Sequence, residues 1–221
     1  MTMSLDRPRR RSAVFLAALS LLSLACATRH PENPALDEYP KGIIGSTDVT
    51  YYDIQGNSAR GLVDEMRRLG PKTAAGGVFF GEAQSPLRWE WRTRADGMDC
   101  SSSFVNVFVR SEIRLPRWTP PTDASPELVA QWKQFITALQ THEIGHKDIA
   151  GRGARDVLTA LQRLRTACSS FSAEAKRATD GIMARVRNEQ AQYDLQTRHG
   201  ATQGATFPPR PARAPSPPGR N

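Results

Sequence analysis

Residues 142–146 spell His-Glu-Ile-Gly-His, an H-E-x-x-H pattern inside a long stretch with helical periodicity. Residues four apart lie on one face of an α-helix, about one turn from each other, so two imidazoles at this spacing can bind one Zn²⁺. Glu143 follows the first histidine and can take a proton from a zinc-bound water. The pattern therefore predicts a helix here, with a hydrolytic zinc site on it.

A surface helix can carry the same residues without a metal, and the pattern also arises by chance. Two observations favour the metal site. Apolar residues on both sides of the motif recur at helical spacing. In addition, three of the four histidines, His142, His146 and His199, fall in the predicted folded domain, whereas His30 falls in a polar linker.

The helix that carries the motif is predicted to run from Pro126 to about Ala167. Ser125 and Pro126 form a strong start signal, because serine caps a helix and proline suits its first position. Gly145 lies between the two histidines. Because glycine costs helix stability, we expect it either to let a group approach the metal closely or to pack against a neighbouring element. A second helix with an apolar stripe is predicted over residues 172–192, packed against the first.

Four β-like runs precede the long helix. The clearest is 103–115, in which apolar and polar residues alternate and which Pro116 should end. The other three runs are 47–54, 77–81 and 87–94. A short helix is predicted between the first two of them. Asn57 or Ser58 caps its start, and Gly70-Pro71 stops it. These elements predict an α+β fold with a small antiparallel or mixed sheet, packed on the motif helix and a second C-terminal helix.

Residues 1–27 are predicted to be an export signal, because arginines precede an apolar run from Ala13 to Leu24 that small residues follow. That run is too short to span a bilayer comfortably. Residues 25–27, Ala-Cys-Ala, fit a signal-peptide cleavage site. Residues 24–26 also resemble the end of a bacterial lipobox, which would leave Cys26 lipidated. We favour the lipoprotein, in the periplasm or at the outer membrane, over a secreted protein without an anchor.

Three further segments complete the predicted organisation. Residues 28–46 are a polar linker, 47–207 the folded domain, and 208–221 a proline-rich, disordered tail. The chain carries a formal net charge of +8. Most of that charge comes from arginines in the export signal and the tail, which argues against nucleic-acid binding by the domain. The sequence gives no prediction of the oligomeric state.

Cys100 and Cys168 are the two cysteines outside the export signal. Two cysteines in an exported domain predict a disulfide in an oxidising compartment. Such a bridge would stabilise the domain by about 2–4 kcal/mol. Two unpaired buried thiols are the alternative. Zinc binding by these cysteines is not expected, because neither lies in a ligand-spaced pair.

A hydrolytic zinc site needs a third protein ligand and one position open for water. His199 is the preferred third ligand, because imidazole suits zinc well. Asp194 is the alternative third ligand, and otherwise it orients a ligand by a hydrogen bond. Tyr193 can donate a hydrogen bond to the developing oxyanion. An ordinary helix end at residues 193–194, followed by a turn at residues 199–200, explains the same residues without a site.

The chain resembles the bacterial domain of unknown function 922, described as predicted secreted zinc-dependent proteases. The similarity covers roughly residues 47–207. It is carried by the residues Asp64-Glu65-Met66, Gly70-Pro71, Leu115-Pro116-Arg117-Trp118, the motif at 142–146, the run from Tyr193 to Ala205, and Phe207-Pro208. This resemblance implies a zincin-like fold and protease activity.

The predicted function is therefore a secreted or envelope-anchored zinc metallopeptidase with one Zn²⁺ per chain, acting on a peptide or protein substrate. Glu143 is its general base. Two alternatives remain: a non-catalytic, zinc-stabilised binding module of the cell envelope, and a zinc amidase acting on cell-wall material.

Overall fold

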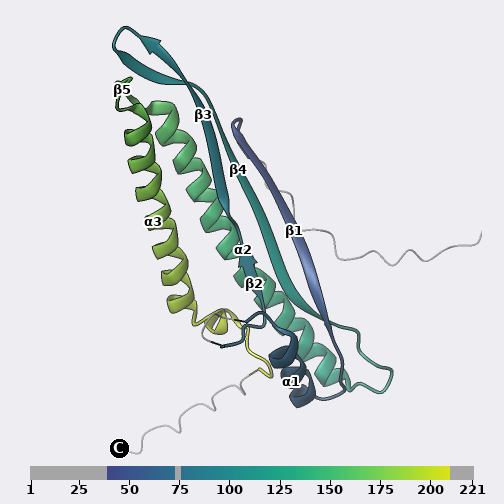
Figure 1. Cartoon of the computed structure of the whole chain (residues 1–221). Helices are drawn as coiled ribbons and strands as arrows, with labels where there is room; N and C mark the ends of the chain where they lie inside the picture. The colour runs from purple at the N-terminus through teal and green to yellow at the C-terminus, as the bar shows by residue number, and fades with distance from the viewer. Residues whose placement is uncertain (1–38, 73–75, 210–221) are drawn as a thin grey trace, which may run out of the picture. The chain divides into compact units, whose positions relative to one another are not determined.

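The computed structural model describes residues 39–72 and 76–209, which form a mixed β-sheet covered by helices (Figure 1). All of them belong to the second of the two compact units of the chain, Asn33–Asn221. The elements in order are β1 (Ile43–Ile54), α1 (Ala59–Leu69), β2 (Glu82–Gln84), β3 (Leu87–Asp96), β4 (Asp99–Trp118), α2 (Pro126–Arg163), β5 (Arg165–Ala167), α3 (Phe171–Thr197) and the 3₁₀ turn η1 (Ala201–Gln203). The predicted export signal, Cys26, and most of the predicted linker and tail lie outside the described residues.

Strand β4 is the centre of the sheet, with partners along both sides. β1 runs parallel to it, from Ile43 opposite Val107 to Ile54 opposite Trp118. β2 and β3 run antiparallel along the other side, and β5 pairs with the start of β4 on the side of β1. The predicted α+β class with a mixed sheet is therefore confirmed.

Several strand boundaries differ from the prediction, among them the start of β1 and the end of β4. β1 begins at Ile43, so it includes the end of the segment expected to be a linker. β4 continues through Pro116 to Trp118. At Pro116 only β1 pairs with β4, because β2 pairs no further than Arg114. One side of the strand is thus open there, and a missing N–H is tolerated at such an edge.

The run 77–81, predicted as a strand, is irregular except for an isolated bridge between Lys72 and Val78. The strand at this place is β2, which begins one residue later, at Glu82. Phe80 is held by other contacts, since its carbonyl accepts a hydrogen bond from the Tyr52 hydroxyl at 2.7 Å. A loop rather than a strand therefore leads into β2.

Both predicted N-caps are present. Ser58 Oγ accepts a hydrogen bond from the Gly61 N–H at the start of α1, and Ser125 Oγ accepts one from the Leu128 N–H at the start of α2. These caps satisfy amides that have no partner within the helix. The start signals in the sequence therefore predicted both helix beginnings correctly.

Both long helices end elsewhere than predicted. α2 ends at Arg163, and the next residues form β5 instead of a further helical turn. α3 extends to Thr197, five residues beyond the predicted end at Gln192. Its last turns therefore carry Tyr193 and Asp194, which the sequence had placed after the helix.

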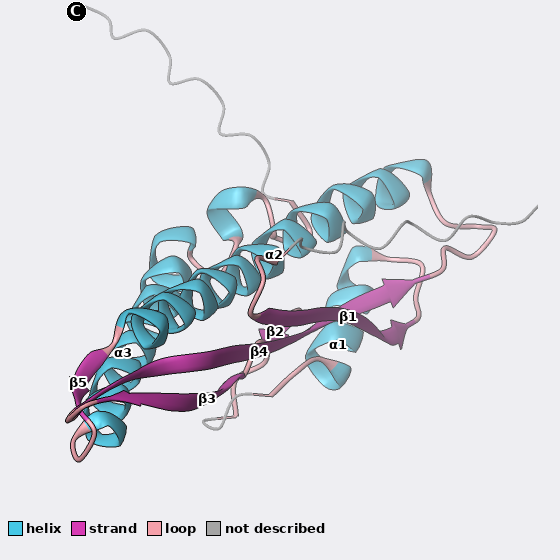
Figure 2. Ribbon diagram, turned by 90° about the horizontal axis from the view of Figure 1, so that it is seen from above, coloured by secondary structure: helices cyan, strands magenta, loops and turns pink. Residues whose placement is uncertain are grey.

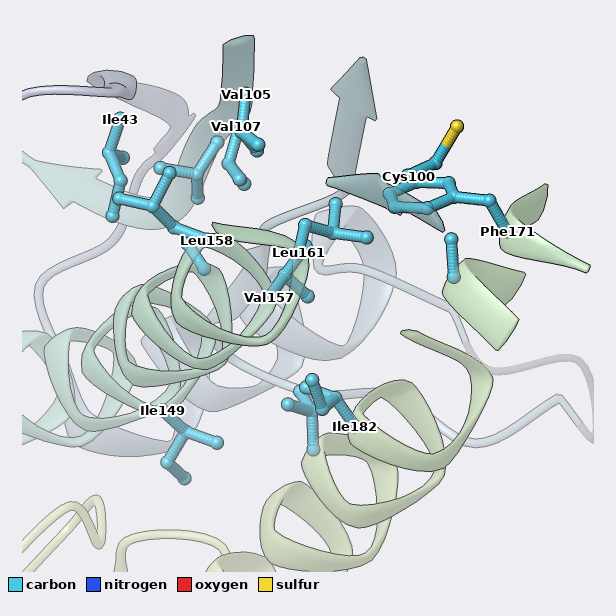
Figure 3. Packing of buried hydrophobic residues seen from close by; sticks show 14 residues of the cluster. Ile43, Cys100, Val105, Val107, Ile149, Val157, Leu158, Leu161, Phe171 and Ile182 are labelled. Atoms are coloured by element: carbon cyan, nitrogen blue, oxygen red, sulfur yellow. The ribbon is translucent and has the colours of Figure 1, made fainter. Parts of the chain in front are cut away.

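Two hydrophobic cores lie along α2. One packs the second half of α2 against α3 and the first half of β4, with Val107, Val157 and Leu161 fully buried (Figure 3). The other brings together residues from the first half of α2, from α1 and from the ends of β1 and β4. The motif at 142–146 lies between these two cores.

The helices cover both faces of the sheet, to different extents. α2 lies along one face with α3 beside it, and α1 lies on the opposite side near the end of β1 (Figure 2). Leu115 and Pro116 are neighbours on β4 and point to opposite faces, yet both are fully buried. No helix among the described residues is long and apolar enough to cross a membrane.

The predicted disulfide between Cys100 and Cys168 is confirmed. It joins β4 to the segment between β5 and α3, across 68 residues of sequence. β5 pairs with Asp99–Ser101 beside it, so the bridge and the short strand together attach the start of α3 to the sheet.

Candidate metal centre and the cavity around it

The middle of α2 presents two converging histidine nitrogens. His142 Nε2 lies 3.3 Å from His146 Nε2, and the two rings are nearly perpendicular, at 83°. The His142 side chain is buried, and that of His146 is mostly buried. Burial lowers the pKa of His142. The neutral imidazole is therefore favoured, and this is the form that binds a metal.

The last turns of α3 bring Asp194 to the same point. Asp194 Oδ1 lies 3.3 Å from His142 Nε2 and 3.1 Å from His146 Nε2. Around a tetrahedral zinc with bonds of about 2.0–2.1 Å, neighbouring donor atoms lie about 3.3 Å apart. The three donor atoms therefore have the spacing that a zinc ion requires. Among the described residues, His142, His146 and Asp194 form the group that could hold a metal ion, called the metal-binding group below.

Two glutamines determine which nitrogen of each imidazole faces the centre. His142 Nδ1 is 3.0 Å from Gln203 Oε1, and His146 Nδ1 contacts Gln190 Oε1. The amide nitrogens are used elsewhere: Gln190 donates to the His146 carbonyl, and Gln203 donates to the Tyr193 hydroxyl. Each Nδ1 therefore carries a hydrogen and donates a hydrogen bond to an amide oxygen. In imidazoles protonated on Nδ1 alone, both Nε2 lone pairs face Asp194 Oδ1, an arrangement that a cation between the three atoms would stabilise.

Tyr193 packs against both histidines. Its ring stacks on His142, with centroids 5.0 Å apart and an interplanar angle of 12°, and meets His146 edge to face. A Cβ at Gly145 would lie 2.1 Å from the Tyr193 hydroxyl oxygen. The glycine inside the motif therefore makes room for this ring, so of the two expectations the structure shows packing against a neighbouring element.

The Tyr193 hydroxyl faces the backbone of α2. It donates to the His142 carbonyl at 3.3 Å and accepts from Gln203 Nε2 at 3.0 Å. Tyr193 is not among the residues that line the cavity described below. Its predicted role as a donor to an oxyanion finds no support in this geometry, which instead assigns it the positioning of the two imidazoles.

His199 lies on the exposed side of Asp194. Its Nδ1 is 3.3 Å from Asp194 Oδ1, and its side chain is 58% exposed. It is not a member of the three-residue group of His142, His146 and Asp194. Its ring contacts Phe79, with centroids 5.3 Å apart. The geometry thus favours Asp194 as the third donor, and metal binding by His199 stays a prediction.

Glu143 is buried beside the two histidines, with 4% of its surface exposed. Burial, followed by the charges of Asp194 and Glu82, raises its pKa from 4.5 to about 8. A Cβ at Gly81 would lie 2.7 Å from Glu143 Oε1, so the loop before β2 passes directly over this carboxyl group. The predicted general base therefore lies in a buried, negatively charged environment.

A cavity of about 500 Å³ opens over these residues. One wall is the segment 78–83, which includes the start of β2. The other wall comes from the end of α3 and the turn that follows it. His142, Glu143 and His146 lie between these walls, together with Asp194. The metal-binding group and the carboxyl group of Glu143 therefore face one accessible space.

The sequence profile of a family described as "Bacterial protein of unknown function (DUF922)" matches residues 49–200. The chain belongs to the DUF922 family. No curated protein and no solved structure matches it. The DUF922 match includes His142, Glu143 and His146, as well as Asp194 and His199, but ends three residues before Gln203.

Several residues of this DUF922 site were missed from the sequence. Gln190 precedes Asp194 by four residues, and this spacing would have placed it on the same helix face had the helix been predicted to extend further. Gln203 and the segment 78–83 carried no comparable signal, because a hydrogen bond from a loop and a cavity wall both depend on tertiary packing. Arg198, which also lines the cavity, was not singled out either.

Proposed function

We propose that this chain is an exported zinc metallopeptidase with a zincin-like catalytic domain. The observation that carries the proposal is the spacing of the three donor atoms of His142, His146 and Asp194, which suits a tetrahedral zinc ion. Two histidine nitrogens and one carboxylate oxygen are ligands that zinc commonly takes. The glutamine contacts to both Nδ1 atoms further support metal binding.

Zinc bound to these donors would act as a Lewis acid toward a peptide carbonyl and would lower the pKa of water. The side chains of the protein itself carry out the proton transfer. Glu143 takes a proton from the attacking water onto its carboxylate and then delivers it to the nitrogen of the leaving amine. The burial of Glu143 favours its protonated form between these two steps.

Strand β2 supports the choice of a peptide substrate. In the described sheet β2 pairs with β4 alone, so its second edge is free. Glu82 and Ala83 of β2 line the cavity beside Glu143. An extended peptide can add to such an edge through main-chain hydrogen bonds, which would hold its carbonyl groups along the metal-binding group.

The disulfide supports export. A bridge between Cys100 and Cys168 is expected in an oxidising compartment and is rare in the cytosol of mesophiles. We therefore keep the periplasm or the outer membrane as the proposed location, with Cys26 as the candidate lipid anchor and secretion as the alternative. Mass spectrometry of the N-terminus of the mature protein would distinguish a lipidated Cys26 from a free cleaved end.

One observation favours a second candidate function. His199 Nδ1 is 3.3 Å from Asp194 Oδ1, so His199 is close enough to supply a fourth ligand after a small movement. Four protein ligands would close the site and leave no position for water, as in structural zinc sites. The protein would then be a zinc-stabilised binding module.

The metal content of the purified chain tests the metal site. We expect about one zinc per wild-type chain after dialysis, and its loss in Asp194→Ala. In His199→Ala the zinc should remain. Loss in His199→Ala together with retention in Asp194→Ala would make His199 the third ligand. Loss in both variants would favour the closed, four-ligand site.

Hydrolysis by Glu143→Gln tests the mechanism. This variant should keep its zinc and lose at least about 100-fold in the rate of peptide hydrolysis, since the proton acceptor is gone. Cleavage of a denatured protein mixture, followed by mass spectrometry, provides the measurement. Hydrolysis at the wild-type rate would exclude the proposed role of Glu143. Absence of hydrolysis by the zinc-loaded wild type would favour the binding module.

A further inference from the structure

Among the described residues that line the cavity, Arg198 is the only lysine or arginine. Glu82, at the start of β2, lines the same cavity, as do Glu143 and Asp194. The lining therefore carries carboxyl groups and one guanidinium.

The guanidinium of Arg198 is available for a ligand. Among the described residues it makes no hydrogen bond and no ion pair, whereas Arg68 and Arg117 each hold a carboxylate. Its backbone is in the left-handed region, with φ 51° and ψ 52°, and His199 follows with φ 52°. Glycine normally ends a helix in this conformation, and another residue costs about 1–2 kcal/mol.

A second hollow of about 350 Å³ adjoins the cavity, and Arg198 and Ala201 belong to the lining of both. The other described residues around this hollow are small or uncharged and polar, among them Gln134, Thr202 and Thr206. Arg198 is the charged residue among them. A ligand group that extends from the cavity past Arg198 therefore meets one positive charge and no negative charge.

We infer that Arg198 recognises a carboxylate of the peptide substrate, bound in the hollow beside the cavity. A guanidinium pairs with a carboxylate through two parallel hydrogen bonds, which gives both affinity and orientation. The inference rests on the proposed peptidase function and specifies its substrate class, a peptide with a negative charge near the cleaved bond. The carboxylate belongs to an aspartate or glutamate side chain, or to the C-terminus of the peptide.

Binding to the zinc-loaded Glu143→Gln chain tests this inference without consuming the peptide. The first probes are N-acetylated, C-amidated alanine octapeptides with one glutamate, each paired with the same peptide carrying glutamine. The second probes are the alanine octapeptide with a free C-terminal carboxylate and with a C-terminal amide. Calorimetric titration gives the dissociation constant of each. The two series distinguish a side-chain carboxylate from a terminal one.

We expect the negatively charged member of one pair to bind at least tenfold more tightly. Arg198→Gln, in the same background, should reduce that ratio to about one, and Arg198→Lys should keep part of it. Arg163→Gln, at the exposed end of α2 and outside both linings, should leave the ratio unchanged. Thermal unfolding of each variant confirms that it is folded.

Two results would overturn the inference. One is equal affinity for the members of every pair, including the absence of measurable binding by all peptides. The other is a charge preference that persists in Arg198→Gln. Both readouts are independent of hydrolysis. A failed cleavage assay with the wild type would therefore count against the proposed function alone.

Discussion

Gln190 contacts His146 twice, since it accepts from Nδ1 and donates to the backbone carbonyl of the same residue. An uncharged acceptor holds the ring in place without adding negative charge to the site. Gln203 likewise accepts from His142 Nδ1, and its amide nitrogen donates to the Tyr193 hydroxyl. The orientation of both rings therefore depends on two side chains that do not touch the metal position.

Replacement of Gln190 by alanine should weaken zinc binding by about 10–100-fold, because the tautomer and the ring angle of His146 are no longer fixed. Competition with a chelator of known affinity measures the change. Gln196→Ala, on an exposed position of the same helix, should bind zinc as tightly as the wild type. Equal effects of the two substitutions would show that Gln190 has no special part in the site.

Glu143 gives the metal-free protein a predictable pH dependence. Its pKa is raised in the folded state, so folding disfavours the ionised form that the unfolded chain prefers above pH 4.5. The folded state is therefore expected to lose stability as the pH rises from 4.5 to about 8, and to lose no more above that. The change is on the order of a few kcal/mol at most.

Glu143→Gln removes this titration. The variant should gain stability relative to the wild type as the pH rises through that window, with no further gain above it. Urea unfolding of the metal-free proteins, with the disulfide intact, measures the difference at each pH. A difference that is constant across the window would contradict the raised pKa.

At the scale of elements, the crossing of α2 and α3 depends on Gly145. Alanine at this position should force Tyr193 away from His142 and cost about 1–3 kcal/mol of folding stability, with weaker zinc binding. Gly151→Ala is the matched control on the same helix. Its new Cβ would meet no atom closer than 3.7 Å, so we expect a gain of about 0.5–1 kcal/mol from helix propensity.

Chemical denaturation of both variants measures their free energies of unfolding, and the comparison separates the effect of the clash from that of helix propensity. Adding Tyr193→Ala to Gly145→Ala should cost less than the sum of the two single changes, because the clash is then already removed. Strict additivity would mean that Gly145 and Tyr193 do not act through each other.

The sequence predicted helix starts better than helix ends. Ser58 and Ser125 are local signals, since each cap contacts an amide three residues further along the chain. The end of α3 has no such signal, because its apolar stripe stops near Val186 and the last turns are held by contacts with α2. For the same reason Asp194 was assigned to a loop, and its carboxylate was ranked below His199.

Short strands were the other failure. β5 has only three residues, and it exists because it pairs with β4 beside the disulfide. The apolar residues at 78–80 suggested a strand. Instead the Phe80 ring packs edge to face against Phe135, with ring centroids 6.2 Å apart. The Phe80 carbonyl accepts a hydrogen bond from the Tyr52 hydroxyl. Contacts made by residues distant in the sequence decided both cases, and no local pattern reports them.

At the scale of the whole molecule, the disulfide and the metal centre lie at opposite ends of α3. The helix has 27 residues, which corresponds to a length of about 40 Å. Replacing Cys100 and Cys168 by serine should therefore lower the free energy of unfolding by about 2–4 kcal/mol and leave zinc affinity at 25 °C unchanged. Chemical denaturation and chelator competition measure the two quantities. A parallel loss of zinc affinity would show that the two ends of the helix are coupled.

The general plan of the molecule followed from the sequence, but the relation between its parts did not. An H-E-x-x-H helix, a second helix and a sheet were all predicted, together with the disulfide. The meeting of the segment 78–83 with the turn after α3 was not, since it depends on how two loops pack across α2. The cavity and Arg198 therefore became visible only in the folded structure.

The site takes its two histidines from the middle of the chain and its other parts from near the end of the described residues, at Asp194 and Gln203. A ribosome makes the histidines first. During synthesis the growing chain therefore carries the complete H-E-x-x-H motif for about fifty residues before it can complete the donor set. A product that stops within α3 before Asp194 would keep the motif intact and lack the third donor of the group.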